Sequence, residues 1–217
     1  MPFKAVIFDL DGTLLDTIKD IADSMNTVLK KIGFPTYKTE AYYYFVGEGM
    51  DVLCKKVIPE PHNTPELIKK CVEMMKIEYQ RNWLNNTKPY PGIPELLTEL
   101  EKRKIKLAVL SNKPDAFTKL FVQKLLPQVN FSMVLGETPD FPKKPAPDGA
   151  LYIARELRIL PEDFIYLGDS AIDIKTALSA GMYPVGALWG FRPAEELITS
   201  GAKKLINRPD ELLEIIS

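Results

Sequence analysis

The sequence predicts an α/β protein with a doubly wound, mostly parallel sheet and a small α-helical domain inserted after the first strand. Short apolar runs alternate with helical patterns over most of the chain, as expected for parallel strands connected by helices. One long stretch near the N-terminus instead has helical periodicity alone. Several of the apolar runs end in polar groups, and ligand sites of parallel sheets lie where strands end.

The first expected strand is Ala5–Leu10, a run of branched and aromatic residues that is broken by Asp9 and ends at a glycine turn. The later helices have recognisable boundaries, such as Pro147-Asp148 at a start and Gly181 after an end. The other expected strands lie at residues 106–110, 131–135, 164–167 and 183–188, and the expected helices at 92–103, 115–126, 147–157, 171–180 and 193–200.

The helical stretch predicts a separate domain. Apolar residues between positions 67 and 83 recur on one helical face, and two prolines and a glycine in residues 88–92 are typical of a hinge or domain border. We therefore expect residues 1–15 and 88–217 to form the core and residues 16–87 to form the helical insertion.

Composition excludes several classes of function. Lys and Arg number 28 against 29 Asp and Glu, a net charge of −1, so the chain lacks the field that non-specific binding to nucleic acid or anionic membranes requires. Its single histidine, His62, rules out metal sites with two or three histidine ligands. The two cysteines do not form a disulfide framework, and no signal peptide or membrane span is evident. We expect a cytoplasmic monomer or small homo-oligomer that binds neither nucleic acid nor membrane.

The strongest local signal is Phe8-Asp9-Leu10-Asp11-Gly12-Thr13, an acid pair at the end of a predicted strand. Asp9 and Asp11 are two residues apart, so they point to the same side of an extended chain. With one histidine available, the acid–base chemistry of an enzyme would rest on such carboxylates.

Three further motifs follow predicted strands. Ser111 and Asn112 offer a hydroxyl and an amide before a helix N-terminus, which suits a phosphate oxygen. Lys144 is a cation among prolines, and Asp169 and Asp173 form a second acid pair one helical turn apart. Each could be a simple helix cap or surface group, but their joint placement at one sheet edge favours a phosphate site.

These motifs resemble the haloacid dehalogenase-like superfamily of phosphatases and phosphotransferases over essentially the whole chain. Residues 9–13 resemble its first motif, Ser111 its second, Lys144 its third, and Asp169 with Asp173 its fourth. The insertion resembles the superfamily's small helical cap. Shorter segments resemble the phosphoglycolate phosphatase-like group within that superfamily. They lie at residues 14–17, 46–49, 90–92, 111–114 and 189–191.

The resemblance implies a Mg²⁺-dependent phosphatase that acts on a small phosphate monoester, 2-phosphoglycolate above others. We expect Asp9 to attack phosphorus and form an aspartyl-phosphate, and Asp11 to act as general acid and then general base. The resemblance assigns Mg²⁺ to Asp9, Asp169 and the Asp11 carbonyl. Asp173 is then either a further ligand or a residue that contacts the ligands without touching the ion. It also assigns the substrate phosphate to Ser111, Asn112 and Lys144.

Substrate specificity is expected in the insertion, where Gly47, Glu48 and Gly49 precede a helical pattern and could present backbone N–H groups to an anion. A plain helix start is the alternative for these residues. Other phosphatase substrates stay open, namely sugar phosphates, nucleotides and pyrophosphate, as does a sugar phosphomutase. The non-enzyme alternative is a signalling receiver that stores phosphate on an aspartate.

Overall fold

The computed structural model describes residues 3–216, and its core is a six-stranded sheet in the order β5-β4-β1-β6-β7-β8. Every pairing in this sheet is parallel. The strands are β1 (Ala5–Phe8), β4 (Lys106–Pro114), β5 (Met133–Glu137), β6 (Phe164–Gly168), β7 (Tyr183–Ala187) and β8 (Lys204–Ile206). The predicted α/β class and parallel sheet are confirmed.

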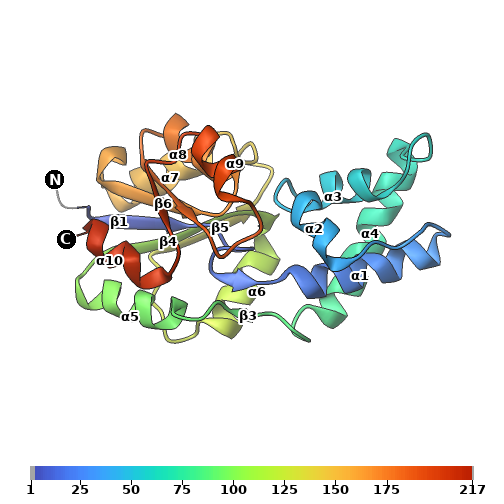
Figure 1. Ribbon diagram of the computed structural model, residues 1–217, viewed down its shortest axis with the longest axis horizontal. Helices are drawn as coiled ribbons and strands as arrows, with labels where there is room; N and C mark the ends of the chain where they lie inside the picture. The colour runs from blue at the N-terminus through green and yellow to red at the C-terminus, as the bar shows by residue number, and fades with distance from the viewer. Residues whose placement is uncertain (1–2, 217) are drawn as a thin grey trace. The chain divides into compact units, whose positions relative to one another are not determined.

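Helices cover both faces of the sheet (Figure 1). The connecting helices are α5 (Ile93–Lys102), α6 (Asp115–Leu125), α7 (Asp148–Leu157), α8 (Ala171–Ser179), α9 (Ala194–Thr199) and α10 (Leu212–Ile216). Side chains of β1 alternate between the two faces, and Ile7 packs in one apolar cluster with Ile153 of α7 and Ala177 of α8. All four residues of β1 are fully buried, which is why this strand reads as a continuous apolar run.

The helical insertion is a second compact unit, residues 16–88, and residues 1–15 with 89–217 form the first. Its helices are α1 (Ile18–Lys31), α2 (Thr39–Phe45), α3 (Met50–Val57) and α4 (Pro65–Asn82). Two-residue strands, β2 (Leu15–Asp16) and β3 (Lys88–Pro89), pair where the chain enters and leaves this unit. Helix α4 begins after Thr64, whose hydroxyl accepts a hydrogen bond from the Leu67 N–H at 3.3 Å.

Inside the helical unit, buried side chains of α1 and α4 meet. The Cys71 sulfur lies 3.9 Å from that of Met25, and Met75 and Tyr79 continue the buried stripe. Asp20 on α1 is 1% exposed. Its carboxylate accepts hydrogen bonds from the backbone and side chains of Asn86 and Thr87. These four bonds tie the beginning of the insertion to its end, and they hold the pKa of Asp20 below its usual value despite burial.

Strand β8, helix α10 and the β2–β3 pair are absent from the sequence-based description. Each has five residues or fewer, too short for a periodic pattern to show. No helix within residues 3–216 is long and apolar enough to cross a membrane. His62 lies exposed in a loop, with its ring 5.6 Å from that of Phe34.

Candidate active site

The loop after β1 makes a tight turn that presents its acids at the carboxyl end of the strand. The carbonyl of Leu10 accepts hydrogen bonds from the N–H groups of Thr13, Leu14 and Leu15. Gly12 has φ +88°, and a Cβ added there would collide with the Asp169 carboxylate. Glycine is therefore required at this position by both the backbone conformation and the space.

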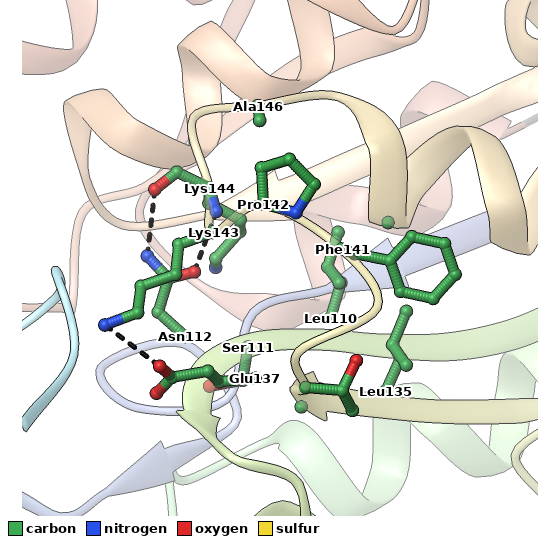
Figure 2. Close-up of a pocket in the computed structure, with 13 residues that line it drawn as sticks. Leu110, Ser111, Asn112, Leu135, Glu137, Phe141, Pro142, Lys143, Lys144 and Ala146 are labelled. Carbon is green, nitrogen blue, oxygen red and sulfur yellow. Dashed lines mark hydrogen bonds and ion pairs between the residues drawn. The ribbon is translucent and has the colours of Figure 1, made fainter.

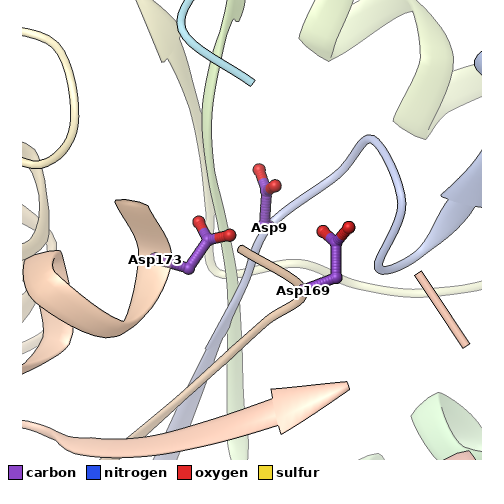
Figure 3. Close-up of side chains that lie close together, drawn as sticks. All are labelled: Asp9, Asp169 and Asp173. Carbon is purple, nitrogen blue, oxygen red and sulfur yellow. The ribbon is translucent and has the colours of Figure 1, made fainter. Parts of the chain in front are cut away.

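Three aspartates meet at this edge of the sheet (Figure 3). Asp9 follows β1, Asp169 follows β6, and Asp173 is on the first turn of α8. One carboxylate oxygen from each lies within 4.8 Å of the others, and all three residues are buried. The sequence prediction places these acids at neighbouring strand ends, and β1 and β6 are paired neighbours in the sheet.

Lys144 lies between two of these aspartates. Its Nζ is 2.8 Å from Asp9 Oδ1 and 2.6 Å from Asp173 Oδ1, and its side chain is 4% exposed. The other oxygen of Asp173 accepts hydrogen bonds from the Ser170 N–H at 3.2 Å and the Ser170 hydroxyl at 2.6 Å. Both oxygens of Asp173 are thus engaged by protein donors.

Asp169 is held by two donors from elsewhere in the chain. The Thr13 hydroxyl donates to its Oδ1 at 3.0 Å, and the Phe191 N–H donates to its Oδ2 at 2.7 Å. Gly190 also approaches so closely that a Cβ there would collide with Asp169. The Trp189 indole N–H donates to the Thr13 carbonyl at 3.0 Å, so the 189–191 segment braces this acid.

Ser111 and Asn112 lie at the end of β4, beside the turn that carries Lys144 (Figure 2). The Asn112 amide accepts from the Lys144 N–H at 2.8 Å and donates to the Lys144 carbonyl at 3.0 Å. Asn112, predicted as a phosphate contact, therefore holds the backbone of Lys144. Ser111 is 4% exposed, and its hydroxyl oxygen accepts from the Lys113 N–H at 3.2 Å. Both residues line a small pocket with Lys144.

Lys113 is a site residue that the sequence analysis missed. Its Nζ lies 3.0 Å and 3.1 Å from the two carboxylate oxygens of Asp11 and 4.6 Å from the centre of the Phe121 ring. Asp11 and Lys113 are 102 positions apart, so no local pattern could join them. The signal that could have joined them is that both residues lie near the ends of neighbouring strands, β1 and β4.

Burial dominates the electrostatics of the aspartate cluster. Burial, followed by repulsion from Asp173, raises the pKa of Asp9 well above its usual value, while Lys144 opposes the shift. The same two causes raise the pKa of Asp169 to about 7, against the hydrogen bonds from Phe191 and Thr13. Burial disfavours the Lys144 ammonium, but the Asp173 and Asp9 carboxylates outweigh it and raise the lysine pKa.

The donor set fits a hard divalent cation. Three carboxyl groups share a buried space with one ammonium, and a buried negative charge without a counter-charge is strongly unfavourable. All the candidate ligand atoms are carboxylate oxygens, which magnesium, calcium and manganese prefer over sulfur or nitrogen. Within residues 3–216, the carboxylates of Asp9, Asp169 and Asp173 lie close enough together to hold such an ion.

The predicted specificity residues lie in the helical unit, before α3. Gly47 and Gly49 have φ of 122° and 96°, and Gly49 is the residue that precedes the first turn of α3. The Glu48 carboxylate pairs with Lys56 Nζ at 2.6 Å. Glycine is favoured at both positions because side-chain-bearing residues rarely adopt these backbone angles.

Known proteins of similar sequence and fold agree with this architecture. The model of the haloacid dehalogenase-like hydrolase family matches residues 6–187. A phosphoglycolate phosphatase of Aquifex aeolicus is 32% identical over 98% of this chain and 96% of its own length. One from Nitrosospira multiformis is 30% identical over 91% of this chain and 88% of its own.

Among solved structures, a candidate phosphoglycolate phosphatase of Lactobacillus delbrueckii subsp. bulgaricus has a TM-score of 0.94 and 32% identity, and the match covers 100% of this chain and 99% of that one. The family match covers most of the chain and includes all four predicted motifs. The chain therefore belongs to the haloacid dehalogenase-like hydrolase family, and within it resembles the phosphoglycolate phosphatases.

Proposed function

We propose that this chain is a Mg²⁺-dependent phosphatase that hydrolyses a small phosphate monoester, 2-phosphoglycolate above others, through an aspartyl-phosphate on Asp9. One observation carries the proposal. Asp9, Asp169 and Asp173 meet at one sheet edge, Asp9 lies 2.8 Å from the Lys144 ammonium, and Asp11 follows two residues after Asp9 in the same turn. This arrangement combines a carboxylate nucleophile, a second acid, and a cation for the incoming phosphate.

In the first step, a carboxylate oxygen of Asp9 attacks phosphorus in line with the ester oxygen. The new bond joins Asp9 to phosphorus, the phosphorus–ester oxygen bond breaks, and Asp11 gives its proton to the departing oxygen. Lys144 offsets the negative charges of the nucleophile and the phosphoryl group. Ser111 is the hydroxyl available to a phosphate oxygen, and Asn112 supports Lys144 through its backbone.

In the second step, water attacks the aspartyl-phosphate and Asp11 takes its proton. The bond from phosphorus to Asp9 breaks, inorganic phosphate leaves, and the Asp9 carboxylate is restored. The two steps share one acid–base group, so the state that Asp11 reaches in the first step is the one that the second step requires.

Asp9 and Asp169 are the proposed side-chain ligands of Mg²⁺, with the carbonyl of Asp11 as a third. A bound Mg²⁺ supplies charge stabilisation for the transferring phosphoryl group. We assign Asp173 to positioning, because its oxygens already accept from Lys144 and Ser170. The helical insertion, predicted at residues 16–87, stays the proposed cap, with Gly47, Glu48 and Gly49 as its specificity residues.

The names of the relatives support 2-phosphoglycolate as the substrate. The test is phosphate release with Mg²⁺ from a panel of 2-phosphoglycolate, pyrophosphate, sugar phosphates and nucleoside monophosphates. We expect 2-phosphoglycolate to give the highest kcat/KM. If it ranks low while another ester is hydrolysed, the substrate assignment falls and the phosphatase assignment stands. If no phosphate is released from any of them, both fall.

A further inference from the structure

Lys113 is a buried lysine for which the proposed mechanism has no role. Its side chain is 6% exposed, and lysine is rarely buried without a partner. The Asp11 carboxylate at 3.0 and 3.1 Å and the face of Phe121 at 4.6 Å hold the ammonium group in place. The flexible stem thus delivers a positive charge to one defined position beside Asp11.

The two buried lysines of the core lie at different parts of the site. Lys144 contacts Asp9 and Asp173, on the side of the proposed nucleophile. Lys113 contacts Asp11, the proposed proton donor to the departing oxygen. In the proposed mechanism the second ammonium is therefore on the side of the leaving group.

We infer that Lys113 binds a carboxylate on the leaving group and makes the site selective for phosphate monoesters of short hydroxy acids. The inference rests on the proposed function, because it takes Asp11 as the group that faces the ester oxygen. It adds a specificity-determining residue in the core to the specificity expected from the insertion.

The distances are compatible with such a substrate. An ester oxygen that is hydrogen-bonded to Asp11 lies about 2.7 Å from a carboxylate oxygen of Asp11. Lys113 Nζ lies 3.0 Å from Asp11 Oδ1. In a two-carbon hydroxy acid, the carboxylate oxygens are three bonds from the ester oxygen, roughly 3–4 Å away. The substrate carboxylate can then contact the Lys113 ammonium at about 2.8 Å while the ester oxygen stays hydrogen-bonded to Asp11.

Charge gives the reason for the selectivity. The leaving group of such a substrate carries a carboxylate, and the Lys113 ammonium attracts this charge and donates a charge-assisted hydrogen bond to it. A neutral leaving group of the same size gains neither effect.

The experiment compares 2-phosphoglycolate with 2-hydroxyethyl phosphate, a neutral-leaving-group ester of similar size, as a ratio of kcat/KM values. We expect the wild-type enzyme to prefer the acid by roughly tenfold or more, the scale of one charge-assisted hydrogen bond. Lys113→Met should lose most of this preference, mainly through KM for the acid. If Lys113→Met also displaces Asp11, kcat falls for both esters alike, and this effect cancels in the ratio of their kcat/KM values.

Two further variants complete the test. Lys113→Arg keeps the charge and should retain the preference for the acid. Lys119→Met removes an exposed lysine that pairs with Asp115 at 2.7 Å, and should leave the ratio unchanged.

The inference is overturned if the wild-type enzyme hydrolyses both esters without preferring the acid, a result that needs no variant to fold. It is also overturned if folded Lys113→Met keeps the wild-type ratio, since Lys113 would then only position Asp11. In both cases phosphatase activity remains, so the proposed function stands. Failure of the wild-type enzyme to hydrolyse either ester or any member of the panel would instead remove the proposed function.

Discussion

The burial of Asp9 and Asp169 predicts that the metal-free protein becomes more stable as pH falls from 8 to 5. Burial and repulsion from Asp173 raise the pKa of Asp169 to about 7 in the folded protein, whereas an unfolded aspartate titrates near ~3.9. Between these values the folded state binds more protons than the unfolded state, so the free energy of unfolding falls as pH rises. Asp9, whose pKa is also raised, acts in the same direction.

The size of this effect follows from the Asp169 shift. Each pH unit within the window changes the free energy of unfolding by about 1.4 kcal/mol per proton. The interval from pH 7 to pH 5 therefore contributes roughly 2–3 kcal/mol from Asp169 alone. For a chain of this size, this corresponds to a rise in Tm of roughly 4–12 °C.

The assay is thermal unfolding followed by circular dichroism, at several pH values with EDTA and again with Mg²⁺. We expect Mg²⁺ to raise Tm more at pH 8 than at pH 5, because protons and the cation compete for the same carboxylates. Asp169→Asn is the control, and it should flatten the pH dependence measured in EDTA. A metal-free Tm that falls from pH 8 to pH 5, or an unchanged slope in Asp169→Asn, would refute this reasoning.

Three other predictions concern single residues. Asp11→Asn should lower kcat by roughly 10²–10⁴ in a phosphate-release assay, while calorimetry should show Mg²⁺ binding largely retained. Loss of Mg²⁺ binding or an unchanged kcat would contradict the proposed role of Asp11. Gly12→Ala should weaken Mg²⁺ binding, because a Cβ at φ +88° collides with Asp169. An unchanged affinity for Mg²⁺ would contradict the role of Asp169 as a ligand. Asp20→Ala removes the acceptor of four donors, of which the two on Thr87 are buried, and should lower the free energy of unfolding in urea by roughly 1–3 kcal/mol. The matched change at exposed Asp23 should cost less than about 0.5 kcal/mol, and equal effects at the two positions would count against the tie across the insertion.

The strand ends were the informative part of the sequence. Asp9, Ser111 and Asp169 each follow an apolar run, and parallel strands bring their carboxyl ends to one edge. The sheet class and the acid cluster therefore follow from local patterns, because the central strands β1 and β6 are fully buried and read as apolar segments.

Contacts between distant segments were not predictable in the same way. Thr13 reaches Asp169 across 156 positions, and Lys113 reaches Asp11 across 102. Such pairs depend on strand order and side-chain direction, which periodicity does not contain. The two hydrogen bonds between the Asn112 amide and the Lys144 backbone are of the same kind, because they join residues 32 positions apart.

The most direct test of the central claim is to trap the phosphorylated enzyme. The enzyme is mixed with 2-phosphoglycolate and Mg²⁺, quenched rapidly, treated with hydroxylamine and digested for mass spectrometry. An aspartyl-phosphate on Asp9 predicts a hydroxamate at that residue, formed only with substrate and absent from Asp9→Asn. A label on another residue, or full activity in Asp9→Asn, would contradict the account.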